Sequence, residues 1–308
     1  MIRITETQVF GFKAALRGMR NPMESWDRSD SVVGIVPQNP DTTWANERYP
    51  WLKVGIVAPE YPCLGNADLT LMKSLILGGN EHRKFLRDIG IWCDIEPNRG
   101  CWQELDTYKI STVRNSCSTM HKLGHRDLLM DDFQDSFVDA DYLEKINVIG
   151  REYRAGGKKD FKLVIKMKRM LPEGFLQKAT YHMNYENALS MFQQRRNHRL
   201  PEWSWTGGTR VVDGRQSICD WIWSLPYMSW MIDAFERRRA WREDWISMIM
   251  SELSNKADEI SSHMEMPFAS ALEGSEILGF LRGVMAKYGA DSEPVEVIAN
   301  AQEPRPKG

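Results

Sequence analysis

Two arginines and two amides stand around one predicted helix of this 308-residue chain, and together they are suited to binding an anion. The helix begins near Asn184, carries Asn187 in its first turn and ends at Arg195 and Arg196. Guanidinium groups donate paired hydrogen bonds that match the oxygens of a phosphate group. These residues therefore favour a site for a phosphate-bearing ligand. The alternative is a solvated helix end, where cations also interact favourably with the helix dipole.

A proline lies upstream of this helix and separates it from the helix that precedes it in the chain. Proline lacks an amide donor and its ring clashes with the preceding turn, so Leu171-Pro172 must end the helix predicted over residues 161–170. Lys168 lies in the last turn of that helix. The polar residues that follow predict a turn that leads directly into the helix at Asn184. The sequence thus places a lysine before the break and the Asn-to-Arg helix after it.

Hydrophobic periodicity predicts an α/β (α+β) fold, with a mixed sheet flanked by helices. Predicted strands cover residues 2–10, 32–36, 54–57 and 89–95, and the two middle ones pair as a hairpin. Predicted helices cover residues 69–77, 102–109, 142–153, 161–170, 184–195 and 218–260, besides a short one through Ala14 and Leu16. Asp68 is the predicted N-cap of the helix over 69–77, and Leu225-Pro226 is predicted to break the helix over 218–260. The hydroxyl-rich segment 112–120 is predicted to form turns that leave donors for a ligand.

Composition divides the chain into three parts. Residues 1–225 are predicted to form the α/β domain, with an excursion over about 32–66. Residues 226–290 are predicted as a helical extension, and the Pro- and Glu-containing stretch 291–308 as a disordered tail. The chain carries twelve tryptophans, many in its last third, and we interpret them as packing residues.

Charge and cysteine content limit the possible partners. The formal net charge of −2 gives no bulk field for nucleic acid, so duplex DNA is not an expected partner. No apolar run reaches the length of a membrane span, and the N-terminus, with Arg3 and Glu6, has no signal-peptide core. Five cysteines, an odd count without a Cys-x-x-Cys pair, indicate free thiols in a reducing cytoplasm.

The sequence contains no self-sufficient catalytic motif. His121 and His125 have the spacing of a two-histidine metal face, but no third ligand is evident, so a metal site is not predicted. We find no phosphate-binding Gly-rich loop, no dinucleotide fingerprint and no Gly-x-Ser-x-Gly elbow. If the chain is an enzyme, we expect a bound cofactor to supply the reactivity.

From Lys168 to Arg195 the sequence resembles the flavin-dependent thymidylate synthases. In that family a basic residue precedes a Leu-Pro pair, and after a polar span an Asn opens a helix that ends at an Arg. Leu171-Pro172, Asn184 and Arg195 stand in this register without a gap. Phage-borne relatives of the family carry similar Asp-Thr-Tyr-Lys and Asn-Ser-Cys-Ser-Thr-Met-His runs.

The resemblance extends upstream and covers roughly residues 68–200. The family has a Gly-rich turn, a Glu-His pair, a strand, and then a helix leading into a Ser/Asn/Glu-rich loop. The matching features here are Gly78-Gly79, Glu81-His82, the strand at 89–95, Glu104 with Thr107-Tyr108-Lys109, and the loop 112–119.

The resemblance implies that the sheet is mainly antiparallel, as in that family's fold. It also implies a C5 alkylation of dUMP or a related pyrimidine deoxynucleotide. FAD would be the cofactor, with methylenetetrahydrofolate and reduced nicotinamide as co-substrates, in a homotetramer with sites shared between chains. The implied catalytic residues are Arg195 and Glu104. The implied cofactor contacts are Glu81, His82, Tyr108, Lys109, Asn115, Ser116 and Asn184. The implied substrate contacts are Lys168, Ser118, Arg195 and Arg196.

The chain departs from the family at the residues that read the base and hold the flavin. The family's Arg-His-Arg is Thr107-Tyr108-Lys109 here, and its base-reading Gln is Glu104. An ionised carboxylate only accepts hydrogen bonds, so Glu104 suits the amino group of cytosine better than an amide would. We therefore hypothesise a different pyrimidine or a hydroxymethyl transfer. The alternative functions are a non-catalytic nucleotide-binding or assembly protein and, disfavoured by the charge, a modifier of bases in DNA.

Overall fold

The computed structural model describes residues 1–35, 56–57, 60–135, 137–207 and 214–237. These residues divide into two compact units, which are described separately. The first unit comprises residues 1–18, 31–64 and 84–229, and it holds the sheet and most of the predicted functional residues. The second unit comprises residues 19–30, 65–83 and 230–308, of which the structure describes the part up to residue 237. The three-part division predicted from composition stays a prediction.

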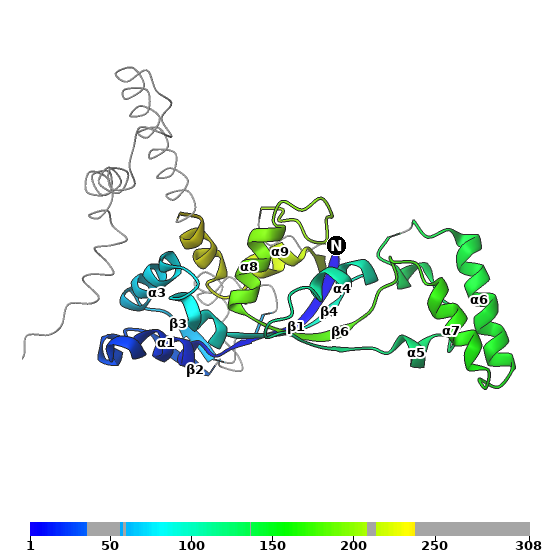
Figure 1. Ribbon diagram of the computed structural model, residues 1–308, viewed down its shortest axis with the longest axis horizontal. Helices are drawn as coiled ribbons and strands as arrows, with labels where there is room; N and C mark the ends of the chain where they lie inside the picture. Colours follow the sequence, from blue (N-terminus) through cyan, green and yellow to red (C-terminus); the bar gives the residue numbers. More distant parts are fainter. Residues whose placement is uncertain (36–55, 58–59, 136, 208–213, 238–308) are drawn as a thin grey trace, which may run out of the picture. The chain divides into compact units, whose positions relative to one another are not determined.

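A five-stranded antiparallel sheet forms the centre of the first unit, in the order β5-β6-β4-β1-β7. Its strands are β1 (Ile2–Phe10), β4 (Gly90–Glu96), β5 (Val113–Ser116), β6 (Ala179–Asn184) and β7 (Arg215–Gln216). A separate antiparallel pair joins β2 (Val32–Ile35) to β3 (Glu60–Cys63). The predicted fold class, a mainly antiparallel sheet flanked by helices, is confirmed (Figure 1).

The two faces of this sheet differ because side chains alternate along each strand. On β4, Ile91 and Cys93 are buried on one face, whereas Trp92 on the other is 42% exposed. Three helices lie over the buried face: α4 (Arg99–Leu105), α8 (Tyr185–Arg195) and α9 (Ile218–Ser224) (Figure 1). The opposite face carries a ring contact between Trp92 and His182, whose centroids lie 4.8 Å apart. Burial lowers the pKa of His182.

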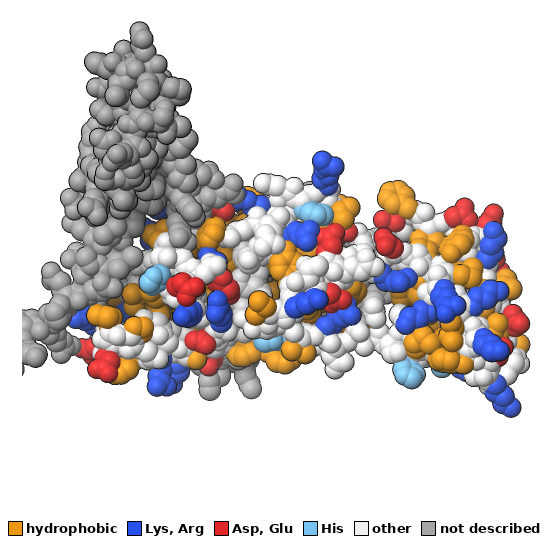
Figure 2. All heavy atoms as spheres, in the orientation of Figure 1, with side chains coloured by type: hydrophobic (Ala, Val, Ile, Leu, Met, Phe, Trp, Pro, Cys, Tyr) orange, Lys and Arg blue, Asp and Glu red, His pale blue; other side chains and the backbone are white. Residues whose placement is uncertain are grey.

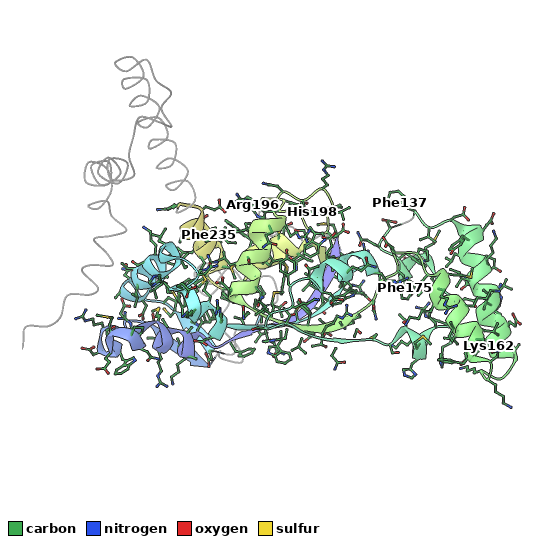
Figure 3. All side chains as sticks on the ribbon, viewed as in Figure 1. Phe137, Lys162, Phe175, Arg196, His198 and Phe235 are labelled. Carbon is green, nitrogen blue, oxygen red and sulfur yellow. The ribbon has the colours of Figure 1, made fainter. Side chains whose placement is uncertain are left out.

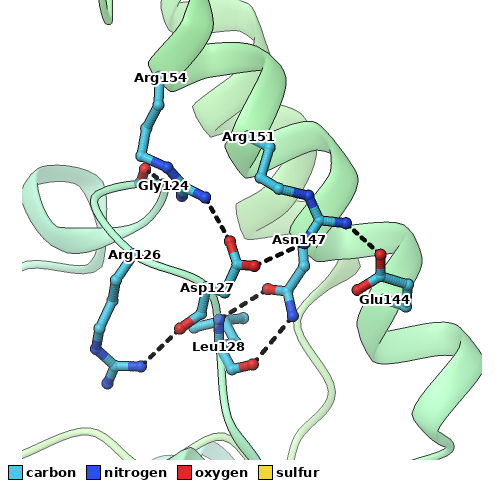
Figure 4. Close-up of polar contacts among 8 residues, drawn as sticks. All are labelled: Gly124, Arg126, Asp127, Leu128, Glu144, Asn147, Arg151 and Arg154. Carbon is cyan, nitrogen blue, oxygen red and sulfur yellow. Dashed lines mark hydrogen bonds and ion pairs between the residues drawn. The ribbon is translucent and has the colours of Figure 1, made fainter.

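A helical lobe with its own hydrophobic core adjoins the sheet in the first unit (Figure 1). It consists of α5 (Thr119–Lys122), α6 (Ala140–Ala155) and α7 (Phe161–Met170). Ile146 of α6 and Met167 of α7 are fully buried in its core. Asn147 fixes the chain before α6, because its side chain bonds both the amide and the carbonyl of Leu128 (Figure 4). Arg151 and Arg154 bind Asp127 from the same helix (Figure 4).

Within the second unit, a buried ion pair fixes α3 (Asn66–Gly78). Arg20, which ends α1 (Phe12–Arg20), donates from Nε to Asp68 at 2.7 Å, and both side chains are buried. Asp30 accepts hydrogen bonds from the amides of Ala67 and Asp68 at the start of α3. The prediction that Asp68 is the N-cap of this helix is wrong, because Gly65 holds that position. The Asp68 side chain is instead paired with Arg20.

The main error of the sequence prediction is the missing central strand β6. The segment after Pro172 was predicted as a turn leading directly into a helix, but residues 179–184 pair with both β4 and β5. Its alternation is short, and its polar positions Thr180 and His182 lie on the more exposed face, which disguised the pattern. The helix after it begins where predicted, at the N-cap Asn184.

Three further elements differ from the prediction. The hydroxyl-rich segment forms the edge strand β5, because its backbone pairs with β6 even though most of its side chains are exposed. The hairpin partner of β2 is β3, while Val57 bonds the backbone of β1 instead. Helix α4 begins at Arg99, three residues early, because the Asn98 side chain caps it.

Several other predictions are confirmed. Strands β1 and β4 and helices α6 and α7 lie where the patterns placed them, and α9 ends at the predicted Leu225-Pro226 break. All five cysteines are free thiols. Trp203 and Trp221 are fully buried, as expected of packing residues. None of the helices in the described residues has the length and apolar character needed to cross a bilayer.

Candidate functional site

The predicted catalytic pair, Arg195 and Glu104, meets in the first unit. Arg195 ends α8, and its NH1 lies 2.7 Å from Oε2 of Glu104 on α4. Its Nε donates to the hydroxyl of Tyr108 at 3.0 Å, and that hydroxyl donates to Gln194 at 3.0 Å. The guanidinium also lies 4.9 Å from the ring centre of Trp203, which is fully buried. Three predicted site residues, Glu104, Tyr108 and Arg195, are thus in contact, although Glu104 and Arg195 are 91 positions apart in the chain.

This cluster holds its charges in a partly buried environment. The side chains of Arg195 and Glu104 are 20% and 32% exposed. Burial acts to lower the pKa of Arg195, but the hydrogen bond to Tyr108 and the attraction of Glu104 outweigh burial and raise it. His198 lies 3.9 Å from the same Glu104 oxygen, at the loop beyond α8 (Figure 3). The arrangement presents a cation and a carboxylate side by side, with an aromatic ring behind them.

Asn184 has a structural role that the structure shows directly. Its side chain accepts from the amide of Asn187 at 2.9 Å, and Asn187 accepts in return from the amide of Asn184. This reciprocal capping box sets the start of α8 and hence the position of Arg195 at its other end. The Asn187 amide group also donates to the carbonyl of Ile110. The predicted contact of Asn184 with a flavin stays a prediction.

The remaining predicted residues are distributed around the first unit. Lys109 and Asn115 are exposed, Ser116 is half-buried on β5, and Ser118 is exposed before α5. Lys168 is exposed on α7 in the helical lobe, whereas Arg195 lies on α8 above the sheet, so a single chain does not bring them together (Figure 1).

The last three predicted residues are Arg196, Glu81 and His82. Arg196 follows Arg195 as the C-cap of α8 (Figure 3). Glu81 and His82 are exposed in a turn of the second unit, next to Gly78. Their predicted cofactor contacts therefore stay predictions.

A basic cavity of about 620 Å³ lies between the sheet edge and the helical lobe. Its charged and polar lining residues are Glu96, Cys117, Ser118, Thr119, His121, Lys122, His125, Arg126, Asp132, Gln177 and Lys178. Arg126 pairs with Asp132 and Lys178 with Asp94, while Lys122 has no partner among the described residues. The predicted substrate residue Ser118 belongs to this cavity.

An acidic cavity of about 740 Å³ lies on the other side of the same chain segment. Its charged lining residues are Glu104, Asp135, Asp139, Glu173 and Glu202. Residues 172–174 line this cavity and residues 175–178 line the basic one; Phe175 marks the change (Figure 3). Sequence reasoning missed Glu202, because its burial depends on packing against residues such as Asn98, 104 positions away in the chain.

The two histidines that suggested a metal face both line the basic cavity. His125 contacts Lys158 at 3.2 Å through Nδ1. In the part of the chain that the structure describes, no group of three or more His, Cys, Asp or Glu side chains has the arrangement of a metal site. Both histidines belong to the wall of the basic cavity, beside Lys122 and Arg126.

The structural comparison finds members of the family that the sequence resembles. Two structures of the flavin-dependent thymidylate synthase ThyX from Helicobacter pylori, each with FAD and dUMP, are similar to this chain. The first shows 14% identity over 76% of this chain and 99% of that chain, with a TM-score of 0.49. The second shows 15% identity over 64% of this chain and 86% of that chain, with a TM-score of 0.44.

A third similar structure is a UMP/dUMP methylase, PolB from Streptomyces cacaoi, bound with 5-Br UMP. It shows 13% identity over 68% of this chain and 96% of that chain, with a TM-score of 0.34. No protein-family model and no curated protein matches the chain. At these identities the ligands and chemistry of this chain must be argued from its own residues.

Proposed function

We propose that this chain is a divergent flavin-dependent enzyme that alkylates C5 of a pyrimidine nucleotide, dUMP or a related deoxynucleotide. The observation that carries the proposal is the half-buried ion pair of Arg195 and Glu104, held by Tyr108 and Trp203. Such a pair is costly to desolvate, so its retention at the end of a capped helix favours a binding role over a structural one.

The Arg195–Glu104 pair matches the hydrogen-bonding edge of a pyrimidine base. The carboxylate of Glu104 accepts from an N–H group, and the guanidinium of Arg195 donates to the neighbouring acceptor. Uracil offers N3–H beside O4, and cytosine offers its amino group beside N3, so both bases complement the pair. Which of the two bases fits the pair depends on where the sugar of the bound nucleotide lies. The hypothesis that Glu104 selects cytosine therefore stays a prediction.

The basic cavity fits the phosphate groups of a nucleotide or of FAD. Lys122, Arg126 and Lys178 supply positive charge, and Ser118 and Thr119 supply hydroxyl donors. FAD, when bound, supplies the hydride chemistry of the proposed reaction. The chain itself binds and orients: the residues of this cavity hold phosphate, and the edge strand β5 beside it offers exposed polar side chains.

The buried thiols of the chain are unsuited to act as nucleophiles. Burial raises the pKa of Cys93 and of Cys101, and it raises that of Cys219 to about 12. A thiol must ionise to attack, so these three residues stay inert at neutral pH. This supports a reaction whose reactivity resides in the cofactor.

The oligomer and the co-substrates are also part of the proposal. Lys168 is exposed on the helical lobe and does not meet Arg195 within one chain, which favours a site completed by a second copy. A homotetramer, methylenetetrahydrofolate and reduced nicotinamide follow from the family resemblance alone. Analytical ultracentrifugation tests the first, and turnover with each co-substrate omitted in turn tests the others.

Flavin titration is the first test of the proposed function. We expect the purified chain, or the chain mixed with FAD, to show the absorbance of a bound flavin near about 450 nm. We expect dUMP to perturb that spectrum, because the proposed reaction requires the base to bind beside the flavin ring. A chain that takes up no FAD under any condition, with or without nucleotide, contradicts the proposal.

Substitution at Arg195 tests the binding role of the pair. Arg195→Ala should weaken nucleotide binding about tenfold to 100-fold, because hydrogen bonds to charged groups contribute roughly 1.5–3 kcal/mol. Arg199→Ala is the matched control, since it removes an exposed cation four residues away. Equal binding by both variants, measured by calorimetry on folded protein, contradicts the role of Arg195.

Glu104→Gln tests which base the pair reads. If Glu104 accepts from the base, the amide variant should change the ratio of the dCMP and dUMP dissociation constants. An unchanged ratio removes Glu104 as the reader of the base.

A non-catalytic nucleotide-binding protein is the second candidate, and one observation favours it. Where the family has Arg-His-Arg, the Thr107 hydroxyl bonds the carbonyl of Glu104, and the Tyr108 hydroxyl is used by Arg195. Only Lys109 is left as a cation at this position. A colourless chain that binds pyrimidine nucleotides but no FAD would establish this alternative.

A further inference from the structure

The acidic cavity has a charge that no nucleotide phosphate or flavin diphosphate would tolerate. Five carboxylates line it, and its lining contains no Lys, Arg or His side chain. Its volume of about 740 Å³ lies within the range of small-molecule sites, roughly 300–1,000 Å³. A ligand of this cavity must therefore be neutral or positively charged. The cavity needs an occupant different from the one that the basic cavity fits.

Glu202 distinguishes this cavity from an ordinary cluster of surface acids. The residue is only 3% exposed, and its backbone carbonyl accepts from the amide of Ile218 at 2.8 Å. Oε1 accepts from the side-chain amide of Asn98 at 3.3 Å. Oε2 is buried and has no hydrogen-bond partner among the described residues. A buried carboxylate oxygen without a donor is strongly unfavourable, and so it indicates that a ligand donor belongs there.

The neighbours of Glu202 do not neutralise it. Asn98 shares its amide group with Gln134, whose Oε1 lies 2.5 Å away. The amine of Met1 interacts electrostatically with Glu202; burial lowers the pKa of this amine, although Glu202 acts to raise it. Glu104 at the far wall is paired with Arg195. The negative charge of Glu202 is thus left for a ligand.

The other carboxylates and the apolar walls define the shape of that ligand. Asp139 caps α6 by accepting from the amide of Tyr142, and Asp135 accepts from the amide of Phe137, so both are used by the fold. Phe137 is 91% exposed, Leu200 45% and Tyr142 37%, which is high for large apolar groups at a cavity wall. These side chains offer a surface for a flat apolar body.

We propose that the acidic cavity is a binding site for a small organic cation of the amidinium or guanidinium class. Paired N–H donors of its head group bind the Glu202 carboxylate, and its apolar body packs against Tyr142 and the rim residues Phe137 and Leu200. An amidinium matches a carboxylate in both charge and geometry. The inference uses Glu202 and the rim of this cavity, whereas the proposed contact with the base uses Glu104 on the far wall of the same cavity.

Three probes of one shape and different charge test the proposal by calorimetry on the full chain. Benzamidine is cationic, benzamide neutral and benzoate anionic. We expect benzamidine to bind at least tenfold more tightly than benzamide, and benzoate not to bind. Equal affinities for benzamidine and benzamide, or no binding of benzamidine, overturn the proposal.

Glu202→Gln tests the residue that carries the inference. The variant should bind benzamidine at least tenfold more weakly, because it loses a charge-assisted hydrogen bond. It should also unfold at a higher temperature than the parent chain, because an unpaired buried charge has been removed. The matched control is Glu152→Gln, an exposed carboxylate on α6 outside the cavity, which should change neither quantity. Unchanged benzamidine affinity in folded Glu202→Gln overturns the proposal.

A second variant keeps the test valid if Glu202→Gln fails to fold. Gly174 lines the cavity, and a Cβ atom added there meets nothing within 4 Å, so Gly174→Leu adds side-chain volume to the cavity with no clash at its Cβ. Its side chain should reduce benzamidine binding at least tenfold while leaving pyrophosphate binding to the basic cavity unchanged. Full benzamidine affinity in this variant overturns the assignment of the ligand to this cavity.

Discussion

The basic cavity and the acidic cavity share one segment of chain, residues 172–178, yet they carry opposite charge. Three Lys or Arg residues and two His residues line the basic cavity beside two carboxylates. The acidic cavity has five carboxylates and no basic lining residue. Figure 2 shows Lys and Arg side chains gathered, with some acidic side chains, on the visible face of the helical lobe.

The two cavities also differ in how their charges are held. The cations of the basic cavity make exposed pairs, such as Arg126 with Asp132, and exposed pairs contribute only about 0–1 kcal/mol. A ligand phosphate can therefore replace the carboxylate with little loss. Glu202 in the acidic cavity is shielded from water and has one oxygen without a donor. The comparison teaches that burial, more than the number of charges, makes a charged cavity selective for its ligand.

The largest expected effect comes from the helical lobe, which supplies walls to both cavities. Ile146 is fully buried in the core of that lobe. Ile146→Ala should lower the free energy of unfolding by about 2–5 kcal/mol, because the cavity left behind fills only partly. Denaturant unfolding followed by circular dichroism measures it. Val148→Ala, at a position 51% exposed on the same helix, is the control and should stay within about 0.5 kcal/mol.

Loss of both ligands in Ile146→Ala would show that the cavities depend on one lobe. Loss of one ligand alone would contradict this shared dependence. The cavity that still binds its ligand would then be formed by residues on the sheet side only. A change in unfolding free energy below about 1 kcal/mol would contradict the burial of Ile146 in a packed core.

The next largest effect separates the cavities by charge. Lys122→Glu should weaken pyrophosphate binding to the basic cavity at least tenfold, because it replaces an unpartnered cation by an anion at the wall. Benzamidine affinity should be unchanged. Lys145→Glu, an exposed charge reversal on α6, controls for net charge. Equal losses in the two variants would mean that pyrophosphate responds to the overall field and not to this cavity.

Salt should affect the two cavities unequally. Raising ionic strength from about 0.1 M to 1 M shortens the Debye length from about 10 Å to about 3 Å. Pyrophosphate binding at the exposed cations should therefore weaken severalfold, while benzamidine binding at the buried Glu202 should change less. Titration calorimetry at the two salt concentrations measures both. A larger salt effect on benzamidine would reverse the comparison.

The smallest expected effect is on the free energy of unfolding at acid pH, to which Asp132 of the basic cavity contributes. Burial acts to raise the pKa of Asp132, but the hydrogen bonds from Arg126 and from the amide of Leu129, together with the positive charge of Arg126, outweigh burial and hold the pKa below its usual value of 3.8. The unfolded chain therefore takes up this proton at higher pH than the folded chain does. The contribution of Asp132 is complete above about pH 3.8 and is lost as the pH falls below that value.

Asp132→Asn should make the unfolding free energy less dependent on pH below about 3.8, by less than about 1 kcal/mol. It should also strengthen pyrophosphate binding at neutral pH, because Arg126 loses its competing carboxylate. Denaturant unfolding between pH 2.5 and 5, a range of roughly two units around the usual carboxyl pKa, measures the first effect. A pH profile identical to that of the parent chain would remove Asp132 as a contributor.

Local patterns were enough to predict several elements and part of the candidate site. The strands β1 and β4 could be predicted from alternation, and the helices α6 and α7 from the spacing of their apolar residues. Each of these elements has one buried face and one exposed face, which produces a clear pattern in the sequence. The start of α8 was readable because Asn184 caps it through a contact three residues away. Glu104 and Arg195 were named from the family resemblance, and the structure brings them together.

Other features depend on partners distant in the chain. The strand β6 exists because β4 and β5 pair with its two edges, and its own six residues carry too little pattern to show this. Glu202 meets Asn98 across 104 positions, so its burial cannot be read locally. The separation of Lys168 from Arg195 likewise depends on which helices pack in which core.

The sequence alone determined the free thiols, the helix that ends at Arg195, and the family resemblance. These follow from residue types and short spacings, because caps, proline breaks and hydrophobic periods act over a few residues. Only the tertiary structure decided that one segment of chain divides a basic cavity from an acidic one, and that the buried Glu202 lacks a partner. Burial and charge neighbourhood are properties of the packed chain, since they arise from residues that the sequence keeps far apart.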